Sequence, residues 1–256
     1  MNKKELKTFL DYKVIQYNTP QFIETDPIKI PHLFQKKEDI EIAGFLTATI
    51  AWGNRKSILK NSGKLMNLMD MSPYDFVMHH DENDLSSLNG FVHRTFNSDD
   101  LSFFIKSLKN IYTNHNGLEN IFSLNATEES LQPAIHKFKS IFFELPHQKR
   151  TEKHVSDPLK NSAAKRINMF LRWMVRNDDT GVDFGVWESL SAAQLSCPLD
   201  VHSGNVARKL GLLKRKMNDA KALKELDNNL RSMDRTDPVK YDFALFGLGV
   251  FEKGNF

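Results

Sequence analysis

The chain has 256 residues, of which 40% are hydrophobic and 26% are charged, and its formal net charge is +3. This length can bury one large core or two smaller lobes, and the sparse glycine content argues against long disordered stretches. Because Cys197 is the single cysteine, the composition excludes an internal disulfide and any metal or iron–sulfur site built from several cysteines.

The composition constrains the binding partners and the cellular compartment less tightly than it constrains disulfides and cysteine-bound metals. No apolar run reaches the ~20 residues that a membrane helix needs, and the first residues lack the apolar stretch of a secretory signal. A mildly basic charge permits nucleic-acid binding through a local patch without requiring it. We therefore expect a protein of the reducing cytoplasm, with no membrane partner, no obligate protein partner and no cofactor.

Apolar residues recur with the period of a helix in most of the first half of the chain. Gly53 would end the first of these segments, and Ser72-Pro73 would open a short one. In chain order the predicted helices cover about 42–50, 55–69, a short segment from 73, 101–112 and 135–143.

The periodicity breaks between Leu145 and Lys160, where two prolines and several polar residues predict an exposed loop. Four helices should follow: one from Ser162 to about 176, one from Asp200 to Gly211, one over 218–233, and one after Asp237-Pro238. No segment alternates as a strand does. The sequence thus predicts one all-α domain over 1–256, with approximate lobes at 38–145 and 155–256.

Lys165 is unusual because of its place in a helix. If Ser162 caps that helix, Lys165 lies in the first turn, where a cation meets the positive end of the helix dipole at a cost of about 0.3–1 kcal/mol. The same field favours the neutral amine, which is the form that attacks a carbon to give a Schiff base. The alternative is a solvated lysine on a polar face, which position alone favours.

Asp200 follows Pro198 and precedes a helix, so it has the position of an N-cap. Capping alone can explain an aspartate there. The helix terminus also favours the ionised carboxylate, and a fixed negative charge can stabilise a sugar that becomes positively charged in a transition state.

Together the two segments resemble a known superfamily. A lysine at a helix start, followed later by the Pro-x-Asp-x-His corner 198–202, is similar to the helix-hairpin-helix DNA glycosylases, which include endonuclease III and the 8-oxoguanine glycosylases. Lys165 and Asp200 match the lysine after the hairpin and the aspartate of the Val-Asp-x-His corner. The resemblance covers about 40–70 and 155–250, and it implies a two-lobed helical fold of helix-hairpin-helix glycosylase type.

An earlier segment agrees with this resemblance. Residues 45–56 are similar to the first-lobe helix and the following turn, which supplies the side chain that fills the gap left by an extruded base. Trp52 or Asn54 would take that place, since a flat ring can stack in the gap; Arg55 is a further candidate for DNA contact. The alternative for Trp52 is a plain core residue.

The whole chain also resembles an uncharacterised bacterial family without an assigned activity. The segments that carry this likeness are 52–55, 168–176 and 241–247.

The hairpin departs from the superfamily. Its usual Leu-Pro-Gly-Val-Gly loop holds a DNA phosphate by backbone N–H groups, whereas residues 157–162 contain no glycine. Lys160, Asn161 and Ser162 can still supply side-chain donors. The interval from Lys165 to Asp200 is also longer than in most members, because of an insertion at 178–191.

The resemblance implies a DNA repair enzyme acting on damaged double-stranded DNA. Arg166, Arg208 and the basic run 214–216 would join Lys160 in binding phosphates, and a damaged base would be flipped into the cleft. Lys165 would form a Schiff base with the sugar, which also permits strand cleavage, and Asp200 would stabilise the sugar cation. His202 would orient Asp200 or contact a phosphate, unless it is a packed helix residue.

Two other readings stay open. Because the hairpin is altered and a fold does not fix a function, the chain can be a non-catalytic domain that binds nucleic acid or protein. The segment His79-His80-Asp81 offers a pair that ligates metal in phosphohydrolases, but the other histidines follow no metal-ligand spacing. Solvated side chains are the expectation there, and we predict no metal site.

Overall fold

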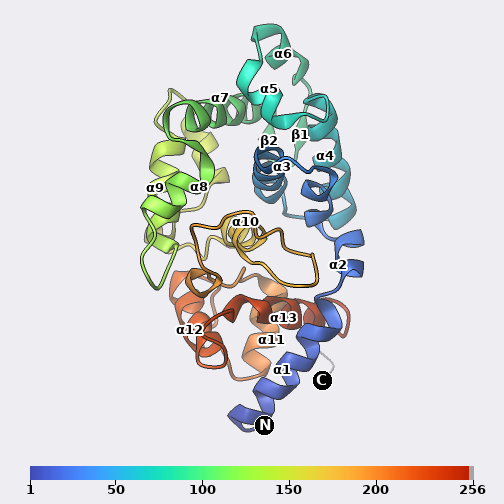
Figure 1. Ribbon diagram of the computed structural model, residues 1–256, viewed down its shortest axis with the longest axis vertical. Coiled ribbons are helices and arrows are strands. Elements are labelled where there is room, and N and C mark those ends of the chain that lie inside the picture. The colour runs from blue at the N-terminus through green and yellow to red at the C-terminus, as the bar shows by residue number, and fades with distance from the viewer. Residues whose placement is uncertain (254–256) are drawn as a thin grey trace.

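The computed structural model describes residues 1–253, and nearly all of its regular structure is helical (Figure 1). This confirms the all-α prediction. One small exception is an antiparallel hairpin of two-residue strands, β1 (Val92–His93) and β2 (Phe96–Asn97). Strands this short cannot show the alternation by which a strand is recognised in a sequence. No helix in 1–253 combines the length and the apolar character needed to cross a membrane.

The helices agree with the predicted segments and add four that were not predicted. The additions are α1 (Lys3–Tyr17), α2 (Pro20–Thr25), α6 (Glu82–Ser87) and α8 (Gly117–Leu124). The others are α3 (Lys37–Thr49), α4 (Arg55–Leu68), α5 (Pro73–His79), α7 (Ser98–Asn114), α9 (Gln132–Phe142), α10 (Lys165–Val175), α11 (Val201–Lys209), α12 (Ala220–Arg231) and α13 (Tyr241–Val250). Short 3-10 turns lie at η1 (Pro27–Lys29), η2 (Pro31–Leu33), η3 (Lys149–His154), η4 (Pro158–Lys160), η5 (Ala192–Gln194) and η6 (Pro238–Lys240).

Two clusters of buried apolar side chains hold the molecule together. The larger is formed by α3 to α5, α7 to α9 and α10, and the smaller by α1 with α11 to α13. Figure 1 shows α10 at mid-height, between the long helices of the two clusters. The opposite ends of the chain meet in the smaller cluster, where α1 packs on α13 and the Tyr241 hydroxyl donates to Asp11 at 2.9 Å. The predicted lobe ranges therefore do not follow the two clusters, since α10 joins the first and α1 the second.

The segment 145–160 is not the exposed loop that its composition predicts. It forms the turns η3 and η4, and Thr151, His154 and Asp157 within it are buried. Asp157 accepts from the Leu159 N–H at 3.0 Å and lies 3.0 Å from His136 Nδ1 on α9. Because Thr151 and Asp157 find hydrogen-bond partners inside the protein, these polar side chains can be buried here.

The long connection after α10 is tied to that helix by buried charges. Arg172 pairs with Asp183 and Asp242, and Arg176 pairs with Asp178 and Asp183. Loss of one partner from a buried pair of this kind costs about 3–5 kcal/mol. The network fixes residues 176–191 against α10 and so fixes the chain that leads to α11.

Candidate active site

The start of α10 is built without glycine and without a side-chain cap. Asn161 and Ala164 both adopt the left-handed conformation, with φ of 63° and 44°. Ser162 is not the N-cap that we expected: its hydroxyl accepts from the Ala164 N–H at 3.1 Å, and Ala164 stands at the N-cap position. Asn tolerates this conformation better than most residues, so Asn161 can form the turn between η4 and α10 where a glycine is absent. Lys165 is the first residue of the helix.

The start of α11 is capped as the sequence predicts. Asp200 is the N-cap, and its Oδ1 accepts from the Ser203 N–H at 3.0 Å. The Ser203 hydroxyl reaches back to accept from the Asp200 N–H at 2.9 Å, which completes a capping box. Asn218 donates to the Asp200 carbonyl at 2.7 Å and fixes the backbone of the corner.

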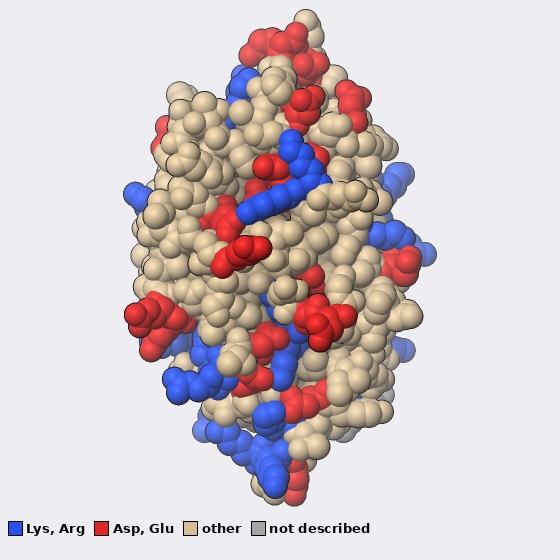
Figure 2. Space-filling view, viewed as in Figure 1, with Lys and Arg blue, Asp and Glu red and all other residues tan. Residues whose placement is uncertain are grey.

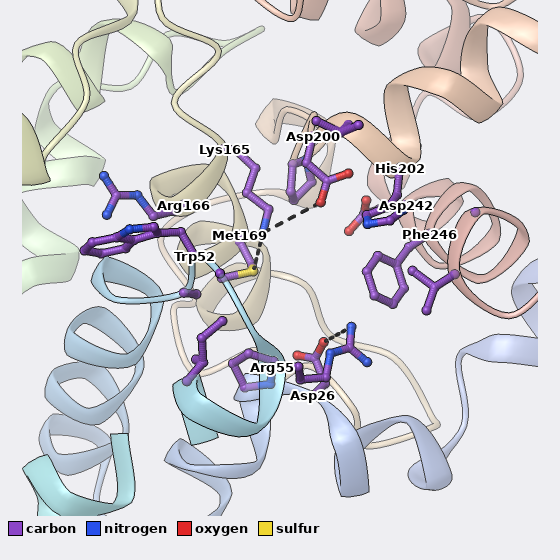
Figure 3. A pocket seen from close by; sticks show the side chains of 18 of the residues that line it. Asp26, Trp52, Arg55, Lys165, Arg166, Met169, Asp200, His202, Asp242 and Phe246 are labelled. Atoms are coloured by element: carbon purple, nitrogen blue, oxygen red, sulfur yellow. Dashed lines mark hydrogen bonds and ion pairs between the residues drawn. The ribbon is translucent and has the colours of Figure 1, made fainter. Parts of the chain in front are cut away.

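Lys165 and Asp200 meet across the space between these two helix starts (Figure 3). Lys165 Nζ lies 4.0 Å from Asp200 Oδ2 and 3.6 Å from the Met169 sulfur. Their side chains are 29% and 25% exposed, so both are reachable by a ligand. One carboxylate oxygen of Asp200 therefore caps α11, and the other faces the Lys165 amine.

Both side chains line one pocket of about 880 Å³. This volume lies within the roughly 300–1,000 Å³ typical of small-molecule sites. Walls come from the turn after α2, the turn before α4, and helices α10, α11 and α13. The lining includes Phe22, Asp26, Trp52, Arg55, Arg166, Met169, Arg172, His202, Asp242 and Phe246.

Two buried acids in this pocket were not predicted. Burial raises the pKa of Asp242 to about 6, against the opposing effect of Arg172. Burial also raises the pKa of Asp26, although the Ile28 N–H and the charges of Arg172 and Arg55 oppose the shift. The available signals were weak: Asp26 precedes a proline as many caps do, and Asp242 lies in the 241–247 segment that carries the family likeness.

Trp52 and Arg166 form one side of the pocket. The Arg166 guanidinium lies over the Trp52 ring, 4.8 Å from its centre, and donates to the Thr49 carbonyl. Burial lowers the pKa of Arg166 to about 10. Trp52 also packs edge-on against His93 at 5.1 Å. Trp52 is therefore half-buried with a surface in the pocket, a position between the two alternatives posed by the sequence.

Arg55 and His202 also line this pocket, whereas other candidate DNA contacts lie outside it. Asn54 is exposed and caps α4 by accepting from the Ser57 N–H at 3.2 Å. Lys160 and Asn161 are exposed at the end of η4, before α10. Arg208 binds the Arg215 carbonyl at 2.8 Å and the side chain of Asn218. Since Asn218 holds Asp200, Arg208 supports the corner rather than facing the pocket.

The remaining charged candidates are spread over the molecule. Arg215 of the run 214–216 pairs with Asp219. His79 lies 2.9 Å from Asp75, and Asp81 caps α6, so the His79-His80-Asp81 segment does not converge. Within residues 1–253 no three histidine, cysteine or acidic side chains gather as a metal-binding group. On the face drawn in Figure 2, basic side chains gather towards the end that holds α1, and acidic ones are scattered over the rest.

The model of a family described as Protein of unknown function (DUF2400) matches residues 26–251. No curated protein and no solved structure matches the chain.

Proposed function

We propose that this chain, which belongs to the DUF2400 family of proteins of unknown function, is a DNA glycosylase with lyase activity on damaged double-stranded DNA. One observation carries the proposal. An amine and a carboxylate that are distant in sequence converge to 4.0 Å at the starts of α10 and α11, inside a pocket of about 880 Å³. The cap of α11 explains Asp200 alone, so the proposal rests on the meeting of Asp200 with Lys165 in this pocket.

The chemistry follows from these two groups. The lone pair of the neutral Lys165 amine attacks C1′ of the sugar, the bond from C1′ to the base breaks, and the departing base takes the electron pair and a proton. The sugar ring then opens: the C1′–O4′ bond breaks, O4′ takes its electron pair and the remaining proton of the nitrogen, and the nitrogen lone pair forms the C=N bond of the Schiff base. Elimination then cuts the strand: a proton is removed from C2′, the C3′–O bond breaks, and the phosphate leaves with the electron pair of that bond.

Asp200 has two roles in this scheme. Its fixed negative charge stabilises the positive charge that develops on the sugar as the base leaves, an effect worth a few kcal/mol in comparable sites. The attack also requires that Lys165 lose a proton, and Asp200 Oδ2 is the carboxylate oxygen paired with its Nζ. A positioned carboxylate of this kind typically contributes 10²–10⁴-fold as a general base.

The altered hairpin is compatible with this proposal. Asn161 supplies the left-handed turn, and the exposed side chains of Lys160 and Asn161 lie on the segment just before Lys165. Arg166, the residue after Lys165, is largely occupied by Trp52 and Thr49. We therefore assign the phosphate contacts to Lys160 and Asn161 in preference to Arg166.

Borohydride trapping tests the proposal. Wild-type protein is mixed with duplexes that carry an abasic site or one of several damaged bases, and borohydride reduces any Schiff base to a stable crosslink. We expect a crosslinked band that is lost in Lys165→Gln and kept in Lys224→Gln, which changes an exposed lysine of α12 outside the pocket. Salt-sensitive binding that ignores damage and gives no crosslink would instead support the non-catalytic binding domain.

A further inference from the structure

A second pair of charged residues lies on the wall of the pocket across from Lys165 and Asp200. Figure 3 shows Asp26 and Arg55 side by side there, with Phe246 close to both. Asp26 Oδ1 accepts from the Ile28 N–H at 3.1 Å, and Oδ2 lies 3.9 Å from Arg55 Nη2. The Arg55 guanidinium lies over the Phe246 ring, 4.9 Å from its centre. A nucleoside whose sugar meets Lys165 would extend its base towards this wall.

Asp26 differs from the other buried acids around Arg172. Asp242 and Asp183 each form direct hydrogen bonds with a guanidinium group. Asp26 is only 7% exposed, yet its side-chain contact with Arg55 is longer than a hydrogen bond. Burial of a carboxylate costs several kcal/mol unless close partners offset it. Within residues 1–253, Asp26 Oδ2 therefore has capacity for a donor from a ligand, and it lines the pocket where a ligand would lie.

The chemistry of the pair selects among bases. A carboxylate only accepts hydrogen bonds, and a guanidinium only donates them. Guanine presents two neighbouring donors, N1–H and the 2-amino group, beside the acceptor O6. Uracil-type bases place one N–H between two carbonyls, so one carbonyl would face the carboxylate. Adenine and cytosine offer a single amino donor on this edge.

We infer that Asp26 and Arg55 read the Watson–Crick edge of a flipped guanine-type base. Asp26 Oδ2 accepts from N1–H, the second lone pair of Oδ1 accepts from the 2-amino group, and Arg55 donates to O6. The apolar rings of Phe22 and Phe246, in edge contact at 5.9 Å, line the same part of the pocket and offer surface for the base. This assignment deepens the proposed glycosylase function and rests on it.

The substrate class follows from the edge that is read. Lesions that keep N1–H, the 2-amino group and O6 fit, for example a guanine oxidised at C8. Guanine methylated on O6 does not fit, because methylation removes the N1–H donor and blocks O6. Sites built to hydrogen-bond a substrate reject analogues that lack the matching group far more strongly than apolar pockets reject size differences.

The experiment compares three duplexes that carry 8-oxoguanine, dihydrouracil or an abasic site. The readout is the rate of borohydride-trapped crosslink on each damaged base divided by the rate on the abasic site, which has no base to read. For wild-type protein we expect this ratio to be at least tenfold higher for 8-oxoguanine than for dihydrouracil. Asp26→Asn should lower the 8-oxoguanine ratio at least tenfold, because its amide places a donor where two acceptors are needed.

Two further variants keep the test decisive. Arg55→Gln, at a partly exposed position, should lower the same ratio even if Asp26→Asn fails to fold. Asp100→Asn changes a buried carboxylate on α7 outside the pocket and should leave the ratio as in wild type. Abasic crosslinks with a preference for dihydrouracil, or with an unchanged ratio in both pocket variants, would overturn the inference and leave the proposed function standing. Absence of crosslinks on abasic DNA would remove both.

Discussion

The starts of α10 and α11 lie on either side of one pocket and are built in opposite ways. At α11 an acidic residue stands at the positive end of the helix, inside a complete capping box. At α10 a lysine stands at the same end, behind an alanine that offers no side-chain cap. Helix stability explains the first arrangement and argues against the second. Lys165 is therefore the residue whose place needs a functional reason, whereas Asp200 serves the fold and the pocket together.

Removal of the Lys165 amine should have the largest effect. Lys165→Gln should reduce the trapped crosslink by more than about 10³-fold, because the Lys165 amine is paired with Asp200, whereas Lys253, which also lines the pocket, follows the end of α13. Its free energy of unfolding should change by less than about 0.5 kcal/mol, because the unfavourable dipole and the partly exposed ion pair are small and opposite. Trapping and urea denaturation measure the two effects. A stability loss above about 2 kcal/mol would show that Lys165 is structural.

Asp200 allows its two roles to be separated. Asn caps a helix about as well as Asp, so Asp200→Asn should keep the stability within about 0.5 kcal/mol while it slows the reaction by about 10²-fold or more. Asp200→Ala should lose the cap as well, at a further cost of about 1 kcal/mol. Single-turnover rates and denaturation curves of both variants provide the measurement. Full activity in Asp200→Asn would reduce this residue to a cap.

The support behind Asp200 predicts a smaller effect. A Cβ at Gly204 would lie 2.8 Å from Asn218 Oδ1, and Asn218 holds the Asp200 carbonyl. Gly204→Ala should therefore displace the corner, slow the reaction about tenfold and destabilise the protein by about 1–3 kcal/mol. Gly63→Ala on α4 is the matched control, because a Cβ there meets open space and should stabilise the helix by about 0.5–1 kcal/mol. Equal reaction rates and equal stabilities of Gly204→Ala and Gly63→Ala would contradict the supporting role assigned to Asn218.

The smallest expected effect concerns pH and the approach to α11. Asp227 accepts from the N–H of Cys197 at 2.9 Å, and Cys197 lies three residues before Asp200. Burial raises the pKa of Asp227 to about 6. A carboxyl whose folded pKa is raised binds its proton more tightly in the folded state, so its contribution to stability is lost as pH rises through about 6. Relative to Asp227→Asn, wild-type protein should gain about 1 kcal/mol on going from pH 7 to pH 5. Denaturation curves of both proteins at pH 5 and pH 7 measure this gain. An equal pH dependence of wild-type protein and Asp227→Asn would contradict the raised pKa of Asp227.

Much of the site could be predicted because its signals are local. Lys165 and Asp200 stand at helix starts that proline, polar residues and apolar periodicity mark in the sequence. The helix α1 carries a usable signal too, since Leu6, Leu10 and Val14 recur four residues apart.

The rest depended on contacts between distant segments. Asp26 lies in a segment of turns, and it becomes part of the pocket only when α4, α10 and α13 pack around it. Arg208 is of the residue type that contacts phosphates, yet its guanidinium donates to the Asn218 side chain and to the Arg215 carbonyl. Local sequence does not tell which partner a charged side chain finds after folding, because that choice is made by tertiary packing.

The most direct test of the central claim is to locate the crosslink. After borohydride reduction on abasic DNA, nuclease treatment and proteolysis, mass spectrometry identifies the peptide that carries the sugar remnant. We predict the remnant on Lys165, with its yield reduced in Asp200→Asn. A remnant on another lysine, such as the exposed Lys160, or none on any lysine, would contradict the assignment of the α10 start as the reacting centre.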